Sequence, residues 1–310
     1  MGDVILTMKD IDKSFPGVHA LDHVNFEVRR GEVHALMGEN GAGKSTTMNI
    51  MTGYLGATEG EVLINGHNIL EEPEAAKKCI GYLPEMPPLY TDMKVNEYLR
   101  FVAELKKIPK PERQEQIEKV MLMVKIMDVQ DRLIKNLSKG YKQRVGLAQA
   151  VLGFPEIIIL DEPTVGLDPK QIIEIRELIR KLAKKHTVIL SSHILAEVRE
   201  VCDYIMIISG GKLVASDTTE NLENMMSGKG QIEVEAKASR DEMDHIIRRT
   251  GKIKEVKYRT SASGITTAQI IAKGGEDIRE ELFLAFSHAD VPMLTLSQSC
   301  LLYTSPSPRD

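Results

Sequence analysis

Tryptophan is absent from this 310-residue chain, and aromatic residues make up only 5% of it. The three cysteines, Cys79, Cys202 and Cys300, form no Cys-x-x-Cys pair and no dense framework, which fits a reducing compartment. The net charge of -5 argues against a strongly basic, nucleic-acid-binding surface. No apolar run approaches membrane-spanning length, and we expect no secretory signal peptide. A function at a membrane would therefore require a partner.

The overall composition is typical of a globular protein, with 42% hydrophobic and 27% charged residues. Short all-apolar runs such as IIIL, residues 157–160, are typical of strands buried in a parallel sheet. They alternate with amphipathic helical patterns, and hairpins are expected to turn at Asn65-Gly66 and at Gly210-Gly211. Residues 1–217 are therefore predicted to form an α/β domain with antiparallel additions.

The pattern changes after residue 217. Residues 218–230 resemble a linker, and residues 231–299 follow the order strand, helix, strand, strand, helix, strand. This split β-α-β order predicts a small C-terminal α+β domain of the ferredoxin-like type. It carries no recognisable chemistry, so a stabilising appendage or dimer contact and a regulatory ligand site both stay open.

The last eleven residues, CLLYTSPSPRD at positions 300–310, show no periodicity. They resemble a translated adapter from a sequencing library, and the alternative is an ordinary flexible tail. We expect residues 300–310 to be an artefact, which leaves them outside the fold, and we expect the natural C-terminus to differ.

The segment GENGAGKST, residues 38–46, matches the phosphate-binding pattern G-x-x-x-x-G-K-[ST], between a strand pattern and a helical pattern. Glycines let backbone N–H groups approach phosphate oxygens closely. Lys44 is expected to reach the β- and γ-phosphates, and the Ser45 hydroxyl to ligate Mg²⁺. A glycine-rich turn that binds nothing is the alternative. The predicted nucleotide-binding residues of this segment are Gly38, Asn40, Gly41, Ala42, Gly43, Lys44, Ser45 and Thr46.

Acidic and imidazole side chains follow two other buried strand patterns. In IIILDEP, Asp161 is placed to hold Mg²⁺ and Glu162 to polarise an attacking water as a general base; acidic residues that merely end a strand are the alternative. His193 follows the run TVILSS. Because parallel sheets gather sites at the carboxyl ends of their strands, we expect His193 at the same edge as Lys44 and Asp161. A satisfied core histidine is the alternative for His193.

One predicted helix begins with an arrangement that suits an anion, although the sequence around it offers none. In NLSKGYKQRVG, Ser138 is a good helix N-cap and Gly140 lies in the first turn. A helix that begins there directs backbone N–H groups outward, which is an arrangement that binds anions. Nothing near it in the sequence supplies the anion.

The phosphate loop, LSKGY, LDEPTVGLD and SSH, in this order and at these spacings, resemble the motifs of ATP-binding cassette (ABC) ATPases. The likeness covers about residues 1–217. It implies a P-loop NTPase fold with a RecA-like core, an antiparallel β subdomain and a helical subdomain at about residues 86–150. It also implies that two cassettes enclose two ATP molecules, with Ser138 and Gly140 of one cassette facing the γ-phosphate held by the other.

The resemblance assigns two further residues. Phe15 lies where the family stacks an aromatic ring on adenine; its alternative is an ordinary core position. Asp168 lies in the turn that crosses the dimer in the family; it is also expected to be a helix N-cap before Pro169.

Two positions depart from the family pattern. The signature, usually Ser-Gly-Gly-Gln, reads Ser138-Lys139-Gly140-Tyr141, and Glu85 stands where the family has glutamine. Because Ser138 and Gly140 are kept, the phosphate contact is expected to persist. Glu85 could ligate Mg²⁺ or repel the γ-phosphate, and both stay open. The departures and the C-terminal domain resemble exporter cassettes of the multidrug-efflux and gliding-motility group.

The resemblance therefore implies an ATPase that binds ATP and Mg²⁺ and energises a membrane transporter, with export favoured. The expected partners are an integral-membrane permease, docking on about residues 85–105, and a second cassette, expected to be an identical copy. The expected location is the cytoplasmic face of the cell membrane.

The alternative function is a soluble cassette ATPase that acts on nucleic acid or ribosomes. Relatives of that kind carry a long coiled coil between the motifs or two cassettes in one chain. Here the intervening helices are broken by Pro109 and Pro111, and only one cassette is found. No basic stripe with interleaved aromatics appears, so no nucleic-acid partner is expected.

Overall fold

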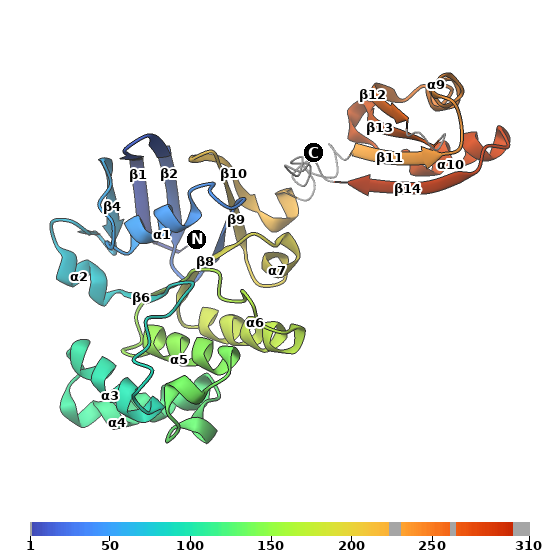
Figure 1. Ribbon diagram of the computed structural model, residues 1–310. Helices are drawn as coiled ribbons and strands as arrows, with labels where there is room; N and C mark the ends of the chain where they lie inside the picture. The colour runs from blue at the N-terminus through green and yellow to red at the C-terminus, as the bar shows by residue number, and fades with distance from the viewer. Residues whose placement is uncertain (1, 223–230, 261–264, 300–310) are drawn as a thin grey trace. The chain divides into compact units, whose positions relative to one another are not determined.

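The chain divides into two compact units, Met1–Thr219 and Glu220–Asp310. A computed structural model describes residues 2–222, 231–260 and 265–299, drawn as a ribbon in Figure 1. The predicted linker begins too early, because Thr218 is the last residue of a strand and residues 219–222 are helical. The rest of the predicted linker and the suspected artefact at 300–310 lie outside the described residues.

A six-stranded sheet forms the centre of the first unit (Figure 1). Its strands are β3 (Val33–Met37), β6 (Ile80–Leu83), β7 (Ile157–Leu160), β8 (Thr187–Ser192), β9 (Tyr204–Ser209) and β10 (Lys212–Thr218). They follow the order β10-β9-β3-β8-β7-β6, and all neighbours are parallel except β10 with β9. Every residue of β3, β7 and β8 is buried, as expected for strands of a sheet covered on both faces.

The register of this sheet brings four strand ends to one edge. Met37 of β3 pairs with Ser192 of β8, and Leu160 of β7 pairs with Leu83 of β6. Because these strands are parallel, their carboxyl ends lie together, and the loops that follow them carry the sequence motifs.

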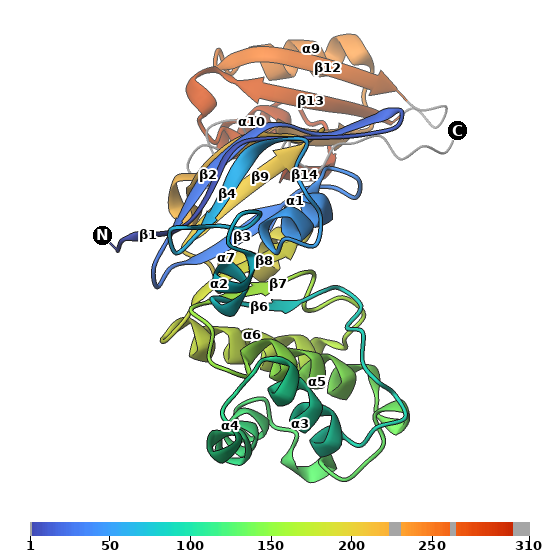
Figure 2. The same ribbon diagram turned by 90° about the vertical axis from the view of Figure 1, so that its left-hand side faces the viewer.

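A second, antiparallel sheet belongs to the same unit (Figure 2). It consists of β1 (Val4–Phe15), β2 (Val18–Arg29), β4 (Glu59–Ile64) and β5 (His67–Asn68), in the order β2-β1-β4-β5. Its apolar face shares one core with α1 (Lys44–Met51), and α2 (Pro73–Lys78) follows β5. Asn65 and Gly66 have φ angles of 49° and 84°, so the predicted type I′ turn between β4 and β5 is confirmed.

Helices form the remaining part of the first unit (Figure 1). They are α3 (Val95–Leu105), α4 (Lys110–Met123), α5 (Lys139–Val151), α6 (Pro169–Ala183) and α7 (Leu195–Arg199), with 3-10 turns η1 (Met127–Val129) and η2 (Ile134–Asn136). Lys106, which ends α3, donates to the carbonyl oxygens of Gln149 (2.7 Å), Ala150 (3.1 Å) and Leu152 (2.6 Å) at the end of α5. Within the described ranges, every helix is too short or too polar to cross a bilayer.

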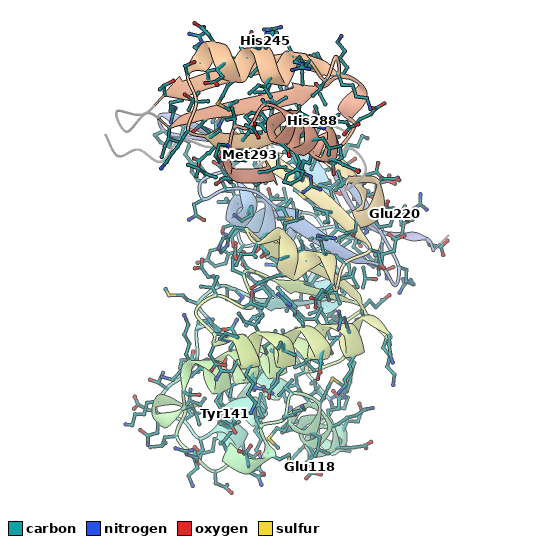
Figure 3. All side chains as sticks on the ribbon, turned by 90° about the vertical axis from the view of Figure 1, so that its right-hand side faces the viewer. Glu118, Tyr141, Glu220, His245, His288 and Met293 are labelled. Carbon is teal, nitrogen blue, oxygen red and sulfur yellow. The ribbon has the colours of Figure 1, made fainter. Side chains whose placement is uncertain are left out.

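The second unit has its own sheet and core. Its elements are β11 (Gln231–Ala236), α9 (Arg240–Arg248), β12 (Ile253–Thr260), β13 (Thr266–Ala272), η3 (Lys273–Gly275), α10 (Arg279–His288) and β14 (Met293–Ser299). The strands are antiparallel, in the order β12-β13-β11-β14. Figure 3 labels His245 on α9 and His288 on α10; the buried apolar residues of both helices, including Phe286, join one core with the sheet.

Gly81 of β6 lies against the end of α5. A Cβ at Gly81 would overlap the carbonyl oxygen of Ala150 and lie 2.8 Å from Cγ of Pro155. We therefore expect Gly81→Ala to lower the free energy of unfolding by about 1–3 kcal/mol. Because the chain has no tryptophan, melting is best followed by circular dichroism. Gly56→Ala is the control, since its Cβ would meet nothing within 4 Å; an equal melting temperature for both variants would contradict the close approach.

Candidate active site

The loop from Gly38 to Gly43 joins β3 to α1 and surrounds the amino group of Lys44. Gly41 and Gly43 have φ angles of 82° and 109°, a left-handed conformation that glycine adopts without steric cost. Nζ of Lys44 donates to the carbonyl oxygens of Gly38 (2.6 Å) and Glu39 (3.2 Å). The ammonium group therefore lies at the centre of the loop, next to the N-terminus of α1, where the helix dipole also favours anions.

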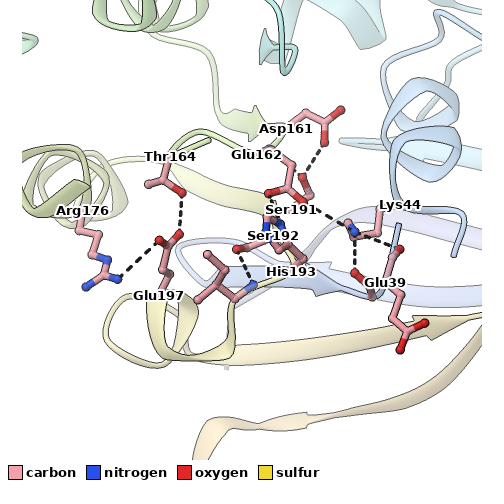
Figure 4. A network of polar contacts seen from close by, with 12 residues as sticks. Glu39, Lys44, Asp161, Glu162, Thr164, Arg176, Ser191, Ser192, His193 and Glu197 are labelled. Carbon is pink, nitrogen blue, oxygen red and sulfur yellow. Dashed lines mark hydrogen bonds and ion pairs between the residues drawn. The ribbon is translucent and has the colours of Figure 1, made fainter. Parts of the chain in front are cut away.

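Glu162 follows β7 and faces this lysine (Figure 4). Its Oε1 lies 3.7 Å from Nζ of Lys44, and its Oε2 lies 3.0 Å from Nδ1 of His193. The φ angle of Glu162 is 44°, which for a residue other than glycine costs about 1–3 kcal/mol. Its backbone N–H donates to Oγ of Ser191 at 2.8 Å, which helps to hold this conformation. The carboxylate is thus fixed between a cation and an imidazole.

Asp161 is buried beside Glu162, and Ser191 also holds it. Oγ of Ser191 donates to Oδ1 of Asp161 at 2.5 Å. Burial raises the pKa of Asp161 above its ordinary value; the Ser191 hydrogen bond opposes the shift, and the charges of Glu162 and Glu85 add to it. Three carboxylates therefore share a small region in which Lys44 is the cation that lowers this pKa.

A cavity of about 730 Å³ opens between these groups. Phe15 lies on its rim at the end of β1, 42% exposed, and Nζ of Lys13 lies 5.2 Å from the centre of its ring. An ordinary core position for Phe15 is thereby excluded. The other predicted residues that line the cavity are Asn40, Gly41, Gly43, Lys44, Ser45, Thr46, Glu85, Glu162 and His193.

Three predicted residues support the cavity without lining it. Gly38 supplies the carbonyl that Lys44 binds, Ala42 is buried in the core that includes α1, and Asp161 is buried below Glu162. His193 lies at the same edge as Lys44 and Asp161, and its side chain is 46% exposed, so a buried core histidine is excluded.

The structure does not bring Ser138, Gly140 or Asp168 to this cavity. Ser138 caps α5 by accepting from the N–H of Tyr141 (3.4 Å), and Asp168 caps α6 by accepting from the N–H of Gln171 (2.9 Å). A Cβ at Gly140 would lie 2.7 Å from the Gln171 side chain. The starts of α5 and α6 therefore lie against each other, on a surface apart from the phosphate loop of the same chain.

Sequence reasoning missed several contributors to these sites. Ser191 bridges Asp161 and Glu162, His19 lines the cavity near Phe15, and Gln171 covers Gly140. Only Ser191 left a signal, because a hydroxyl in an otherwise apolar, buried strand must find a hydrogen-bond partner.

The chain is similar to several known proteins. A family model described as ABC transporter matches residues 21–165. The bacitracin transport ATP-binding protein BcrA of Bacillus licheniformis is 36% identical over 221 residues, which are 71% of this chain and 71% of that protein. The uncharacterized ABC transporter ATP-binding protein YhcH of Bacillus subtilis (strain 168) is 40% identical over 212 residues, 68% of each chain. The solved dimeric, post-hydrolysis cassette MJ0796 bound to ADP and Pi is 26% identical, with a TM-score of 0.64, covering 69% of this chain and 98% of that one.

The chain belongs to the ATP-binding cassette family of ABC transporters. It is an ATP-binding and ATP-hydrolysing transporter subunit, and the predicted P-loop NTPase cassette fold is confirmed. The relatives named above are transporter subunits, so the alternative of a cassette that acts on nucleic acid or ribosomes is not favoured.

The buried Asp161 makes stability depend on pH. Its raised pKa means that the folded chain holds this proton more tightly than the unfolded chain, whose carboxyl has the ordinary value of 3.8. The stability that comes from the proton on Asp161 is fully present below pH 3.8. It is lost as the pH rises through the pKa of Asp161 in the folded chain. Asp161→Asn removes the charge, and its amide oxygen can still accept from Ser191. We therefore expect the variant, without nucleotide, to melt at a higher temperature than the wild type at pH 7.

This gain should shrink as the pH falls toward 3.8, which circular-dichroism melting at a series of pH values measures. Asp92→Asn is the control, because the Asp92 side chain is exposed and no gain is expected. A lower melting temperature for Asp161→Asn at pH 7, or a gain that does not depend on pH, would contradict the prediction.

Proposed function

We propose that Glu162 is the general base of ATP hydrolysis in this chain and that His193 orients it. The observation that carries the proposal is one carboxylate held between Lys44 and His193, in a cavity that the phosphate loop lines. Glu162 would accept a proton from the attacking water as the water oxygen bonds to the γ-phosphorus and the bond from that phosphorus to the bridging oxygen breaks. A carboxylate that only paired with the charge of Lys44 would not accept this proton, so proton acceptance defines the proposed role.

The phosphate loop and the rim supply the binding energy in this proposal. Backbone N–H groups of the loop and Nζ of Lys44 stabilise the charge on the phosphates, while Phe15 stacks on adenine. Phe15 is partly exposed at the rim of the cavity, so a base in the cavity can reach its ring. The proposed nucleotide-binding residues are those predicted from the motifs: Phe15, Gly38, Asn40, Gly41, Ala42, Gly43, Lys44, Ser45, Thr46 and Glu85.

The carboxylates fit a divalent cation. Asp161, Glu162 and Glu85 bring more negative charge to the region than Lys44 balances, and oxygen donors are the ligands that Mg²⁺ prefers. Ser45, Asp161 and Glu85 would hold Mg²⁺ between them. The ion would neutralise charge on the β- and γ-phosphates. Two roles were left open for Glu85: binding Mg²⁺ or repelling the γ-phosphate. Binding Mg²⁺ therefore fits better.

The second half of the catalytic site belongs to another copy of this chain in our proposal. Ser138 and Asp168 are exposed at helix starts apart from the cavity of their own chain, and Gly140 lies beside them under the Gln171 side chain. A helix N-terminus favours a phosphate. A head-to-tail homodimer would place these helix starts over the γ-phosphate of the partner. The solved dimeric state of MJ0796 supports such pairing of cassettes.

The remaining partner is a membrane permease. After β6 the chain exposes apolar side chains: Met86 is 84% exposed, and the Tyr90 ring packs edge-on against Phe101 at 5.3 Å. Exposed apolar side chains in this segment are suited to docking a short helix. Docking on residues 85–105 would hold the chain at the cytoplasmic face of the membrane. BcrA is named for bacitracin transport, which supports export as the direction.

Glu162→Gln tests the role of the general base. The amide keeps the size of the side chain but cannot accept the proton, so we expect hydrolysis to slow by about 10²–10⁴-fold while ATP still binds. The slow variant should accumulate as an ATP-dependent dimer in light scattering. Rapid hydrolysis by Glu162→Gln would refute the proposed base, and a monomer insensitive to ATP would count against the enclosed dimer.

Ser138→Arg tests whether the signature helix acts on the partner. The large side chain would block approach of a second cassette, so we expect hydrolysis to fall by about 10²–10³-fold. ATP binding to the monomer, measured by calorimetry, should not weaken. Ser239→Arg, which alters the N-cap of α9 in the second unit, is the control and should keep its activity. Weaker ATP binding by the Ser138→Arg monomer would place this residue in its own chain's site instead.

A further inference from the structure

The loop that carries Glu162 is held by hydrogen bonds at two points (Figure 4). Ser191 and His193 hold Glu162 itself. Two residues further on, Oγ1 of Thr164 donates to Oε2 of Glu197 at 2.6 Å. Both members of this second contact are well shielded, since Thr164 is 8% exposed and the Glu197 side chain 10%. The second contact has no part in the chemistry proposed above.

Glu197 in turn contacts α6. Its Oε1 lies 4.0 Å from Nη2 of Arg176, and Nη1 of Arg176 lies 3.4 Å from Oε2 of Glu200. Arg180, one turn further along α6, donates to the carbonyl oxygen of Glu200 from Nε (3.0 Å) and Nη2 (2.6 Å). Two arginines of α6 therefore fix the short helix α7, which begins directly after the loop that carries His193.

The same α6 begins at Asp168, in the segment proposed to meet the second cassette. A helix transmits displacement along its axis as a rigid element, so a shift at its N-terminus moves Arg176 as well. Arg176 touches Glu197, and Glu197 touches Thr164. A continuous set of contacts thus runs from the start of α6 to the loop that holds the proposed base.

We infer that Glu197 is a positioning residue for ATP hydrolysis, which acts by accepting the Thr164 hydrogen bond. The left-handed backbone at Glu162 is unfavourable for a glutamate and persists only where its surroundings fix it. Ser191 fixes the loop at Glu162, and Glu197 fixes it two residues later. Without the second contact the loop relaxes, and the carboxylate of Glu162 leaves the geometry that catalysis requires. This inference depends on the proposed role of Glu162.

Thr164→Val tests the hydrogen bond with little change in shape. We expect kcat to fall by about 10–100-fold, as for other groups that orient a catalytic residue, while KM for ATP stays at its wild-type value. The melting temperature should fall only slightly, because one buried hydrogen bond is lost and the fold is kept. Thr164→Ser keeps the hydroxyl and should restore most of the activity. These measurements use the full chain, with ATP turnover and circular-dichroism melting recorded for each variant.

A double-variant cycle tests whether Glu197 is the partner through which Thr164 acts. Glu197→Ala should lower kcat as Thr164→Val does, and the double variant should lose no more than either single variant. Glu200→Gln is the matched control: Glu200 is the C-cap residue of α7 and pairs with the same α6 arginine, but its hydrogen bonds and ion pairs do not include Thr164. It should keep the wild-type kcat.

The outcomes separate this inference from the proposed function. Glu162→Gln serves as the reference in the same assay. If Glu162→Gln is inactive and Thr164→Val retains the wild-type kcat, the positioning role is wrong and the base stands. If Thr164→Ser is as slow as Thr164→Val, or if the two losses add in the double variant, the positioning role is also wrong. If Glu162→Gln is fully active, the proposed base itself fails.

Discussion

The parallel register of β6, β7, β8 and β3 is the constraint on which the candidate site depends. Since these strands run in one direction, their carboxyl ends share an edge, and the loops that follow them must meet there. Three such connections carry Lys44, Glu162 and His193. The Glu162 carboxylate lies 3.7 Å from Nζ of Lys44 and 3.0 Å from Nδ1 of His193. The parallel sheet is therefore enough to bring together residues that are far apart in the sequence.

This assembly opposes the stability of the fold. It concentrates carboxylates at a buried edge, raises the pKa of Asp161, and holds Glu162 in a left-handed backbone. Ser191 offsets part of both costs, because its hydroxyl donates to Asp161 and accepts from the Glu162 backbone. Unfavourable charge and backbone conformation therefore occur where we propose that the chemistry takes place, and a functional site is where a folded protein is expected to tolerate them.

The sequence was sufficient for features that depend on local chemistry. The sequence carries a signal within a few residues for glycines at left-handed positions, for an N-cap at Ser138 and for an all-apolar buried strand at residues 157–160. The structure contains all of them. The cassette fold followed from four such motifs in order. The proposed catalytic and binding roles of individual residues stay predictions, because position alone does not demonstrate chemistry.

Features that depend on tertiary contacts could not be predicted. The side chain of Gln171 covers Gly140, and Glu197 accepts from Thr164, but neither glutamine nor glutamate in a helix signals what it will touch. The start of the linker was placed too early because Thr218, a polar residue, pairs with Tyr204 and extends β10. Pairing with a neighbouring strand decided the boundary, and composition did not.

The separation of Ser138 from the phosphate loop within one chain has a genetic consequence. In the proposed head-to-tail pair, each site takes Lys44 from one chain and Ser138 from the other. A chain damaged at Lys44 and a chain damaged at Ser138 would each be inactive alone. Mixed together, they would form pairs in which both lesions fall in one site and the other site is intact. Two defective alleles of this gene would therefore complement each other.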